Sequence, residues 1–394
     1  MKEPATIILK SGKDQSLKRM HPWIFSGAIK KIKGNVAEGD LVKVISNHDE
    51  YLGSGHFQPG SIAVRILTFG NEEINESFWF KKISEAYNYR VSTGIAKNNE
   101  TNVFRLINAE GDGLPGLIVD YYNGTAVIQM HSVGMLKNID HIVKGLKNAL
   151  GNNLIAVYNK SESTLPFKAE EKSENGYLFG KREDNIVLEY GNKFEINWEE
   201  GQKTGFFIDQ RENRRLVGNY SEGKKVLNVF CYTGGFSVYA LQGKAKMVHS
   251  VDSSKPAIDL TNKNIAHNFN DPVHESYCTD AFNFLDNMGN DYDLVILDPP
   301  AFAKHGNVLS NALQGYKRLN MKALSKIKKG GILFTFSCSQ VVDKENFRKS
   351  VFAASANTGR NVRILHQLSQ PVDHPVNIYH PEGEYLKGLV LYVE

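Results

Sequence analysis

The run Tyr292 to Phe302, YDLVILDPPAF, decides the fold, because a short apolar stretch ends abruptly in Asp298 and two prolines. A second apolar run, GILFTF at 331–336, comes just before Cys338, and residues 310–328 between the two runs have the length and pattern of a helix. Strand, helix and strand imply a right-handed crossover, so the two strands should be neighbours in one parallel sheet. Open α/β sheets bind ligands at the carboxyl ends of such strands. We therefore expect Asp298 and Cys338 beside one crevice.

The chain has three cysteines, and we assign chemistry to Cys338 alone. A thiol is a soft nucleophile suited to adding to an electron-poor ring carbon, so its place opposite a carboxylate indicates an enzyme that activates a pyrimidine base covalently. Cys231 lies in a turn and Cys278 in a strand, and we interpret both as inert fillers. Three scattered cysteines exclude a disulfide framework and a tetrahedral zinc site, which favours a reducing, cytoplasmic compartment.

Length and composition favour a soluble protein of two or three domains. The chain has 394 residues, of which 41% are hydrophobic and 23% charged. No apolar run approaches the roughly 18–20 residues that span a bilayer, and the first residues do not form a secretory signal. Residues 1–70 hold ten Lys/Arg against six Asp/Glu, which accounts for the whole net charge of +4. This bias suits a phosphate-backbone partner, and equally a solvated surface.

The first seventy-odd residues alternate apolar and polar positions between Gly-rich turns, which predicts a small β-barrel-like unit. Inside it lies KRMHPWIFSG, at 18–27. Nucleic acids are bound by cations combined with aromatic faces. We expect Trp23 and Phe25 in the barrel core, and Arg19 and His21 on the surface as RNA-binding candidates.

The remaining pattern divides the chain further. A helical stretch at 72–95 is followed by strands from Phe104, the turn DGLPG at 112–116 and a helix over 135–150. From about Val226, strands and helices alternate, which predicts a doubly wound α/β sheet with an antiparallel strand near its end. We divide the chain into three domains at 1–72, 73–190 and 191–394.

The first βα turn of the doubly wound sheet is NVFCYTGGFS, at 228–237. Its glycines allow a ligand to approach the backbone, but the three spaced glycines of a dinucleotide site are absent. Asp252 and Asp280 close the next two strands, placed to accept from a ribose and from an adenine amine. A strand-end aspartate is often only a helix cap, yet three in succession, with Asp298, favour a ligand site. An adenosine ligand without phosphate fits, and S-adenosylmethionine is the cofactor that we expect.

Long strings along nearly the whole chain resemble one family. They are HPWIFSGAI, DGLPG, GQKTGFFIDQRENR, VLNVFCYTGGFSV, LDPPAF, SCS and DHPVNIYHPEGEYLKG. The chain resembles the class I S-adenosylmethionine-dependent methyltransferases, and more narrowly the bacterial 23S ribosomal RNA 5-methylcytosine methyltransferases with an N-terminal PUA domain. The resemblance implies a PUA-like RNA-binding domain at 1–72, a central α+β domain at 73–190, a Rossmann-like methyltransferase domain at 191–394, and 23S ribosomal RNA as partner.

The resemblance also implies which residues bind the cofactor. The segment 201–211 would cover it, Asn228, Tyr232 and Gly234 would hold the methionine moiety, Asp252 the ribose and Asp280 the adenine. Asn228 stands where many methyltransferases have an acidic residue. The complete set that we expect at the cofactor is Thr204, Phe206, Asp209, Gln210, Asn228, Phe230, Tyr232, Gly234, Asp252, Ser253, Asp280, Ala281, Asp298 and Pro299.

The expected reaction begins when the Cys338 thiolate adds to carbon 6 of cytosine, which makes carbon 5 nucleophilic. Asp298 would hold the exocyclic amine or N3 as charge develops. The positive end of the helix after Ser339, together with the sulfonium, should help to form the thiolate. The sequence does not identify the base that removes the carbon 5 proton. Many RNA cytosine methyltransferases carry a second cysteine where this chain has Pro300.

Further candidates and other functions stay open. Lys304 and Lys317 are RNA-binding candidates, while His305, Tyr316, His374 and His380 either border the substrate or lie on the surface. The histidines lack ligand spacing, so we expect no metal. The oligomeric state is open, a homodimer included. The alternative functions are a nucleobase N-methyltransferase, a 5-methyluridine-forming RNA methyltransferase and a non-catalytic RNA-binding assembly factor; a hydride-transfer enzyme fits least.

Overall fold

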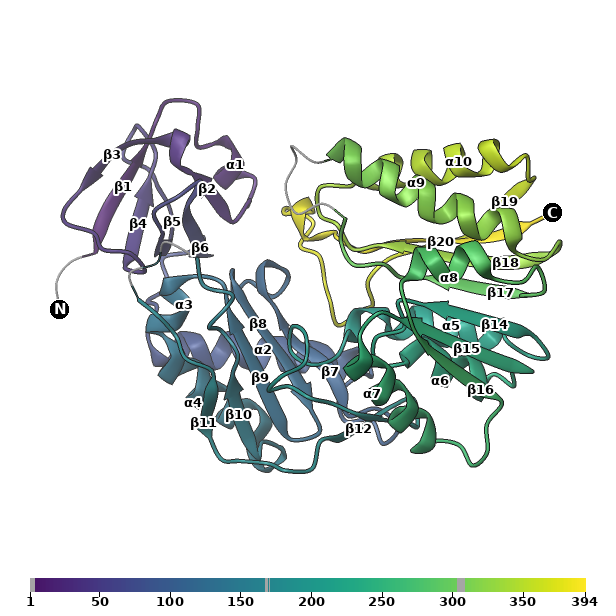
Figure 1. Cartoon of the computed structure of the whole chain (residues 1–394). Coiled ribbons are helices and arrows are strands. Elements are labelled where there is room, and N and C mark those ends of the chain that lie inside the picture. The colour runs from purple at the N-terminus through teal and green to yellow at the C-terminus, as the bar shows by residue number, and fades with distance from the viewer. Residues whose placement is uncertain (1–3, 167–168, 170, 303–308) are drawn as a thin grey trace. The chain divides into compact units, whose positions relative to one another are not determined.

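The computed structural model describes residues 4–166, 169, 171–302 and 309–394. The chain forms two compact units (Figure 1). The first unit contains the chain up to Val187 together with residues 196–206 and 372–383. The second unit contains residues 188–195, 207–371 and 384–394. Within the described ranges, no helix combines the length and the apolar character that crossing a membrane requires.

The first unit begins with a six-stranded sheet in the order β2-β6-β5-β4-β1-β3. Its elements are β1 Ala5–Leu9, α1 Gln15–Lys18, β2 Trp23–Phe25, β3 Ile29–Lys33, β4 Leu41–Ile45, β5 Tyr51–Phe57 and β6 Ile62–Thr68. Ile24 is 1% exposed and belongs to the barrel core. Because side chains alternate along a strand, Phe25 points outward and is 49% exposed. The expectation that Phe25 lies in the core is therefore wrong, and Trp23 is only partly buried.

The same unit contains a five-stranded sheet in the order β11-β10-β9-β8-β7. Its elements are α2 Glu76–Ser92, β7 Val103–Asn108, β8 Leu117–Tyr122, β9 Thr125–Met130, α3 Val133–Lys137, α4 Ile139–Leu150, β10 Ala156–Asn159 and β11 Gly176–Phe179. The single helix expected over 135–150 is two helices, because Asn138 leaves helical geometry at φ −105° and ψ 15°. Gly145 allows α4 to pack closely on α2, since a Cβ there would lie 2.5 Å from Ile83.

A two-stranded sheet, β12 Ile186–Glu189 and β13 Asn192–Glu195, precedes the main sheet of the second unit. That sheet has seven strands in the order β16-β15-β14-β17-β18-β20-β19. Its strands are β14 Lys225–Val229, β15 Met247–Asp252, β16 His274–Cys278, β17 Leu294–Leu297, β18 Gly331–Ser337, β19 Val362–Leu368 and β20 Lys387–Val393. The expected antiparallel strand near the end is β20, which pairs antiparallel with β18 and with β19.

Helices cover both faces of this sheet (Figure 1), which is why the central strands β17 and β18 are buried at every position and largely apolar. The helices are α5 Arg211–Asn219, α6 Gly235–Gln242, α7 Lys255–Ala266, α8 Ala281–Asn287, α9 Leu309–Lys326 and α10 Lys344–Thr358. Val295 and Leu297 of β17 face the core formed with α8, α9 and α10, whereas Leu294 and Ile296 face the core formed with α5 and α6. The parallel neighbours β17 and β18 place Leu297 opposite Thr335. Asp298 and Cys338 therefore leave the sheet at the same edge.

Candidate active site

Asp298 follows β17, and its partly buried carboxyl group lies among side chains that oppose its ionisation. Burial and, to a smaller extent, the negative charge of Asp209 raise the pKa of Asp298 to about 7, although a hydrogen bond from Gln210 works against both. That bond runs from Nε2 of Gln210 to Oδ1 of Asp298 at 3.0 Å. Near neutral pH the carboxyl group is therefore poised between donating and accepting a proton.

Cys338 follows β18 and is partly buried, so that part of the residue is accessible to solvent. Burial, together with the charges of Asp298 and Asp209, raises the pKa of the thiol to about 12. The charge of Lys387 works the other way. The expected helix after Ser339 begins only at Lys344, with Asp343 as its cap, so it does not follow the thiol directly. Without help, the thiol is a weak nucleophile at neutral pH.

Asp209 links this pair to the end of the chain. The hydroxyl of Tyr385 donates to Oδ2 of Asp209 at 2.7 Å. Its other carboxylate oxygen, Oδ1, is buried and has no hydrogen-bond partner among the residues that the structure describes. A buried carboxylate oxygen without a donor is costly, so this position suits a cationic or N–H-bearing ligand. Gln210, which is 3% exposed, is held in turn by Nδ2 of Asn213 at 2.6 Å.

The turn after β14 is strained in the way that ligand loops often are. Phe230 and Tyr232 have φ of 62° and 47°, although neither is glycine. Gly234 has φ 76° and is the N-cap residue of α6, and a Cβ there would lie 2.7 Å from Thr261. Asn228 is fully buried, and it donates through Nδ2 to Ser237 while its Oδ1 lacks a partner among the described residues.

The strand-end aspartates differ in what they already bind. Asp252 accepts from the backbone N–H of Tyr232 at 3.0 Å and of Ser254 at 2.9 Å, which fixes its carboxylate at the edge of the turn. Asp280 is exposed and caps α8 by accepting from the N–H of Asn283. Of the flanking candidates, Ser253 is exposed, whereas Ala281 and Pro299 are buried. Their roles at the cofactor stay predictions.

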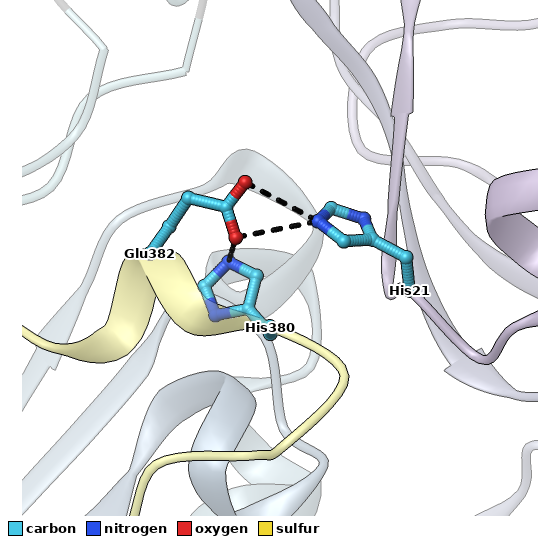
Figure 2. A group of neighbouring side chains, drawn as sticks. All are labelled: His21, His380 and Glu382. Carbon is cyan, nitrogen blue, oxygen red and sulfur yellow. Dashed lines mark hydrogen bonds and ion pairs between the residues drawn. The ribbon is translucent and has the colours of Figure 1, made fainter.

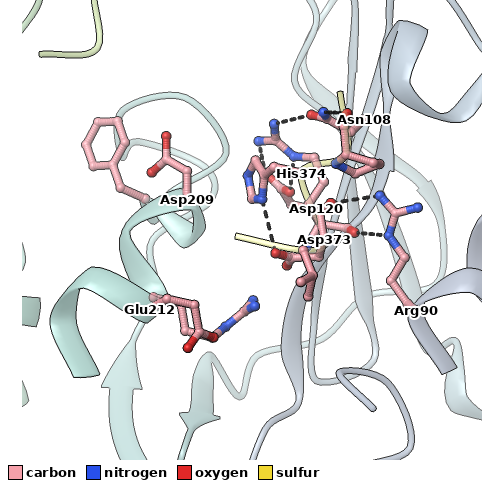
Figure 3. Close-up of polar contacts among 12 residues, drawn as sticks. Arg90, Asn108, Asp120, Asp209, Glu212, Asp373 and His374 are labelled. Carbon is pink, nitrogen blue, oxygen red and sulfur yellow. Dashed lines mark hydrogen bonds and ion pairs between the residues drawn. The ribbon is translucent and has the colours of Figure 1, made fainter. Parts of the chain in front are cut away.

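Two expected cofactor residues, Thr204 and Phe206, lie in the first unit and are buried there. The hydroxyl of Thr204 donates to Asp120 at 2.6 Å and lies 2.8 Å from the hydroxyl of Tyr122. Asp120 also accepts two hydrogen bonds from Arg105, at 2.7 and 3.0 Å. Figure 3 shows Asp120 in this network, beside Arg90 and Asp373. The hydroxyl of Thr204 therefore anchors its segment to the five-stranded sheet.

The RNA-binding candidates are spread over both units. Arg19 is exposed on the barrel, and His21 is partly exposed nearby. Lys317 is partly buried on α9, whereas Tyr316 is fully buried and accepts from the Ser337 hydroxyl at 2.9 Å. His374 is buried in the first unit. Lys304 and His305 lie outside the described residues.

His21, His380 and Glu382 meet in the first unit with their ligand-type atoms within 4.8 Å of one another, a grouping that sequence spacing does not reveal (Figure 2). The N–H of Trp23 donates to Nδ1 of His21 at 3.2 Å, so the neutral ring carries its proton on Nε2. Nε2 lies 3.4 Å from both carboxylate oxygens of Glu382 and donates to them. A metal would need the lone pair that this proton occupies. The arrangement thus satisfies the carboxylate without a cation.

Comparison with known proteins adds the family. Residues 7–69 match a PUA-like domain, and residues 111–377 match the S-adenosylmethionine-dependent methyltransferases. The chain is 39% identical to ribosomal RNA large subunit methyltransferase I of Alteromonas mediterranea over 98% of both chains. It is 38% identical to the enzyme of the same name from Aeromonas hydrophila, over 98% of this chain and 99% of that one. The chain belongs to the S-adenosylmethionine-dependent methyltransferase family.

The same fold occurs in two solved structures. One is a putative SAM-dependent methyltransferase from Streptococcus mutans, with a TM-score of 0.83, 22% identity, and coverage of 98% of this chain and 100% of that chain. The other is a putative methyltransferase complexed with SAH, with a TM-score of 0.84, 23% identity and the same coverage. The expected PUA-like domain, the Rossmann-like methyltransferase fold and S-adenosylmethionine as cofactor are thereby confirmed.

The residues of this methyltransferase fit that cofactor. S-adenosylmethionine supplies an electrophilic methyl group on a sulfonium, and a cation is the ligand that a buried, unpartnered carboxylate oxygen such as Oδ1 of Asp209 calls for. Asp252, fixed by two backbone donors, keeps lone pairs for ribose hydroxyls.

Tyr385 and Lys387 of this methyltransferase contact the site, and sequence reasoning missed both. Tyr385 donates to Asp209, and Lys387 is 5% exposed with its ammonium at the carbonyl of Ser339. One signal was available, because Lys387 is a charged residue at the start of an otherwise apolar strand. Nothing in the sequence assigns it to the edge that carries Cys338.

Proposed function

We propose that this methyltransferase forms 5-methylcytosine in large-subunit ribosomal RNA, in the cytoplasm, through a covalent adduct of Cys338. One observation carries the proposal: a partly exposed thiol follows β18, and a carboxyl group with a pKa of about 7 follows the neighbouring strand β17. Full-length relatives at 38–39% identity are named ribosomal RNA large subunit methyltransferase I, which supports the RNA substrate.

The chemistry follows from the two groups. The thiolate of Cys338 forms a bond to carbon 6, and the electron pair of the 5,6 double bond moves into the ring. Asp298 in its protonated form donates to N3, which neutralises the charge that arrives there. The resulting enamine makes carbon 5 nucleophilic, so that carbon 5 would take the methyl group from the sulfonium and S-adenosylhomocysteine would leave. A base then removes the carbon 5 proton, the 5,6 double bond re-forms, sulfur leaves as thiolate, and the N3 proton returns to Asp298.

The surface of the PUA-like domain supports an RNA substrate. Phe25 is 49% and Met20 is 44% exposed, and Arg19, which precedes Met20, is exposed as well. The ring of Phe25 lies 6.5 Å from the ring of His21. Exposed aromatic rings together with cations on one surface bind unpaired bases and phosphates. We assign Arg19, His21 and Phe25 to RNA contact.

The test combines mapping with trapping. Ribosomal RNA from cells that lack this protein is analysed by mass spectrometry, and loss of one 5-methylcytosine is expected. Purified protein is then incubated with S-adenosylmethionine and RNA that contains 5-fluorocytosine, which cannot release a proton from carbon 5. Wild type should form a covalent complex and Cys338→Ala should not, while Cys278→Ala, the matched control, should behave as wild type. A Cys338→Ala enzyme that keeps its rate would refute the proposal.

A nucleobase N-methyltransferase is the second candidate, favoured by the Asp-Pro-Pro string at 298–300 and by the high pKa of Cys338. In that reaction Asp298 would orient an exocyclic amine and no thiol would be needed. Cys338→Ala separates the two, because it should cost the cytosine-5 reaction several powers of ten and should leave the N-methyl reaction nearly intact. Nucleoside analysis of the product distinguishes 5-methylcytosine from 5-methyluridine in the same experiment.

A further inference from the structure

Lys387 begins β20 and is 5% exposed, which is unusual for a lysine. A buried ammonium group is costly unless acceptors or a negative charge replace its water. Two backbone carbonyls do part of this: Nζ lies 2.5 Å from the oxygen of Ser339 and 2.6 Å from the oxygen of Tyr385. An ammonium group carries three hydrogens, so these two carbonyls leave one donor unassigned among the described residues.

The chain segment that carries Cys338 contacts Lys387 at two points. Strands β18 and β20 pair antiparallel with Lys387 opposite Ser337, the residue before Cys338. The carbonyl that Nζ binds belongs to Ser339, the residue after Cys338. The lysine is therefore fixed to the chain on both sides of the thiol by strand pairing and by a hydrogen bond.

The charges around the thiol are otherwise unfavourable to a thiolate. Three titratable side chains act on Cys338: Asp298 after β17, Asp209 in the short helix Ile208–Gln210, and Tyr316 on α9. The negative charges of the two aspartates raise the pKa of the Cys338 thiol. Lys387 is the cation that opposes them. Burial lowers the pKa of Lys387 to about 8, the charges of Cys338, Asp343 and Glu384 oppose this, and the charge of Lys344 adds to it.

We propose that Lys387 is the charge partner of the Cys338 thiolate, a positioning residue whose buried ammonium group stabilises the nucleophile before it adds to the base. The inference rests on the proposed covalent function and names a residue for that reaction. The thiol proton leaves to solvent, the ammonium group keeps its three hydrogens below its pKa of about 8, and the sulfur lone pair forms the bond to carbon 6. When sulfur departs as thiolate, the same ammonium group receives the returning charge. Ion pairing of this kind is worth most where water is excluded.

A purely structural lysine would tie the ends of β18 and β20 together and do nothing to the thiol. Lys387→Gln separates the two roles, because a side-chain amide still donates hydrogen bonds to the carbonyls and carries no charge. Lys387→Arg is the matched variant, because it keeps both the charge and the donors.

The experiment measures the rate at which iodoacetamide alkylates Cys338 in the full-length protein between pH 6 and 8, where Lys387 carries its charge, and peptide mass spectrometry resolves the individual cysteines. Cys278 is exposed and serves as the internal control in every sample. In Lys387→Gln the Cys338 rate at pH 7.5 should fall about tenfold, the change that one pKa unit produces, and its pH profile should move to higher pH. Lys387→Arg should keep the wild-type rate, and Cys278 should not change.

Equal Cys338 profiles in wild type and Lys387→Gln would overturn the inference, as would an equal loss in Lys387→Arg. If Lys387→Gln does not fold, Lys387→Met and Lys387→Arg are compared in its place, and equal profiles again overturn it. This outcome is distinct from failure of the proposed function. An active Cys338→Ala enzyme refutes the covalent reaction, whereas the alkylation profile reports the charge pairing whether or not Cys338 is catalytic.

Discussion

Replacing Asp298 by Asn should stabilise the protein at alkaline pH. The folded-state pKa of Asp298 is raised from 3.8 to about 7, so the proton is held more tightly in the folded than in the unfolded chain. The tighter binding of this proton in the folded chain contributes to the free energy of unfolding. Compared with an aspartate of ordinary pKa, this contribution is complete below pH 3.8 and is lost as the pH rises to about 7. Asn carries no charge and can still accept from Gln210, so it avoids the cost of burying the ion.

The magnitude follows from the two pKa values. Their difference corresponds to about 4 kcal/mol above pH 7, and partial exposure of the carboxyl group reduces this to about 2 kcal/mol. For a unit of this size, that is a rise of about 4–8 °C in Tm. Thermal unfolding of both proteins is followed at pH 8 and pH 5. The difference should be full at pH 8 and about a third as large at pH 5, where the folded wild type is mostly protonated.

Asp293 provides a control of opposite sign at the other end of the same strand. Burial works against ionisation there, but the side chain of Lys328, at 2.7 Å, and the N–H of Lys225 lower the pKa of Asp293 overall. Asp293→Asn should therefore destabilise at pH 8, and less as the pH falls towards 4. If Asp298→Asn lowers Tm at pH 8, or raises it equally at both pH values, the reasoning about Asp298 is wrong.

Two further substitutions test the turn after β14 and the surface of the PUA-like domain. Gly234→Ala should lower Tm and cost at least tenfold in S-adenosylmethionine affinity by calorimetry, because φ is 76° and a Cβ would lie 2.7 Å from a side chain of α7. Gly223→Ala is the control: Gly223 also has a positive φ, of 69°, but a Cβ there would meet no atom within 4 Å. This variant should therefore bind S-adenosylmethionine as tightly as wild type. Phe25→Ala should weaken binding of a single-stranded RNA by about 1–3 kcal/mol in a filter-binding assay, with Tm unchanged. An unchanged RNA affinity would remove Phe25 from the proposed contact surface.

The sheet of the second unit could be predicted because strands that are buried on both faces are apolar runs in the sequence. YDLVIL and GILFTF are largely apolar runs followed closely by turn residues, and the helix between them fixes their order. The edge that carries Asp298 and Cys338 follows from that order alone.

The errors occurred where the pattern is short. Strand β2 has only three residues, so the sequence alone does not decide whether Ile24 or its neighbours face the core. The break at Asn138 is equally local, because apolar positions continue on both sides of it.

Contacts between distant parts of the chain could not be predicted at all. His21 and Glu382 are 361 positions apart, and Tyr385 reaches Asp209 across 176 positions. No periodicity encodes such pairs, which depend on how loops return to the core. The surroundings of Asp298 and Cys338, and so their pKa values, belong to this class.

Asp209 offers the most direct test of how the charges at this site work together. The reaction needs one proton on the pair, with Asp298 protonated and Cys338 ionised. The pKa values of about 7 for Asp298 and about 12 for Cys338 mean that this one proton lies mostly on Cys338 instead. The rate should therefore fall as the pH drops below about 7, where both groups hold their protons.

The negative charge of Asp209 contributes to the high pKa of Asp298, so Asp209→Asn should lower that pKa and move the acidic limb of kcat to lower pH. Tyr385→Phe removes a donor to Asp209 and leaves its charge, so its acidic limb should stay near 7. Measured at saturating S-adenosylmethionine and RNA, a limb that does not move in Asp209→Asn would mean that burial alone sets the acidity of Asp298.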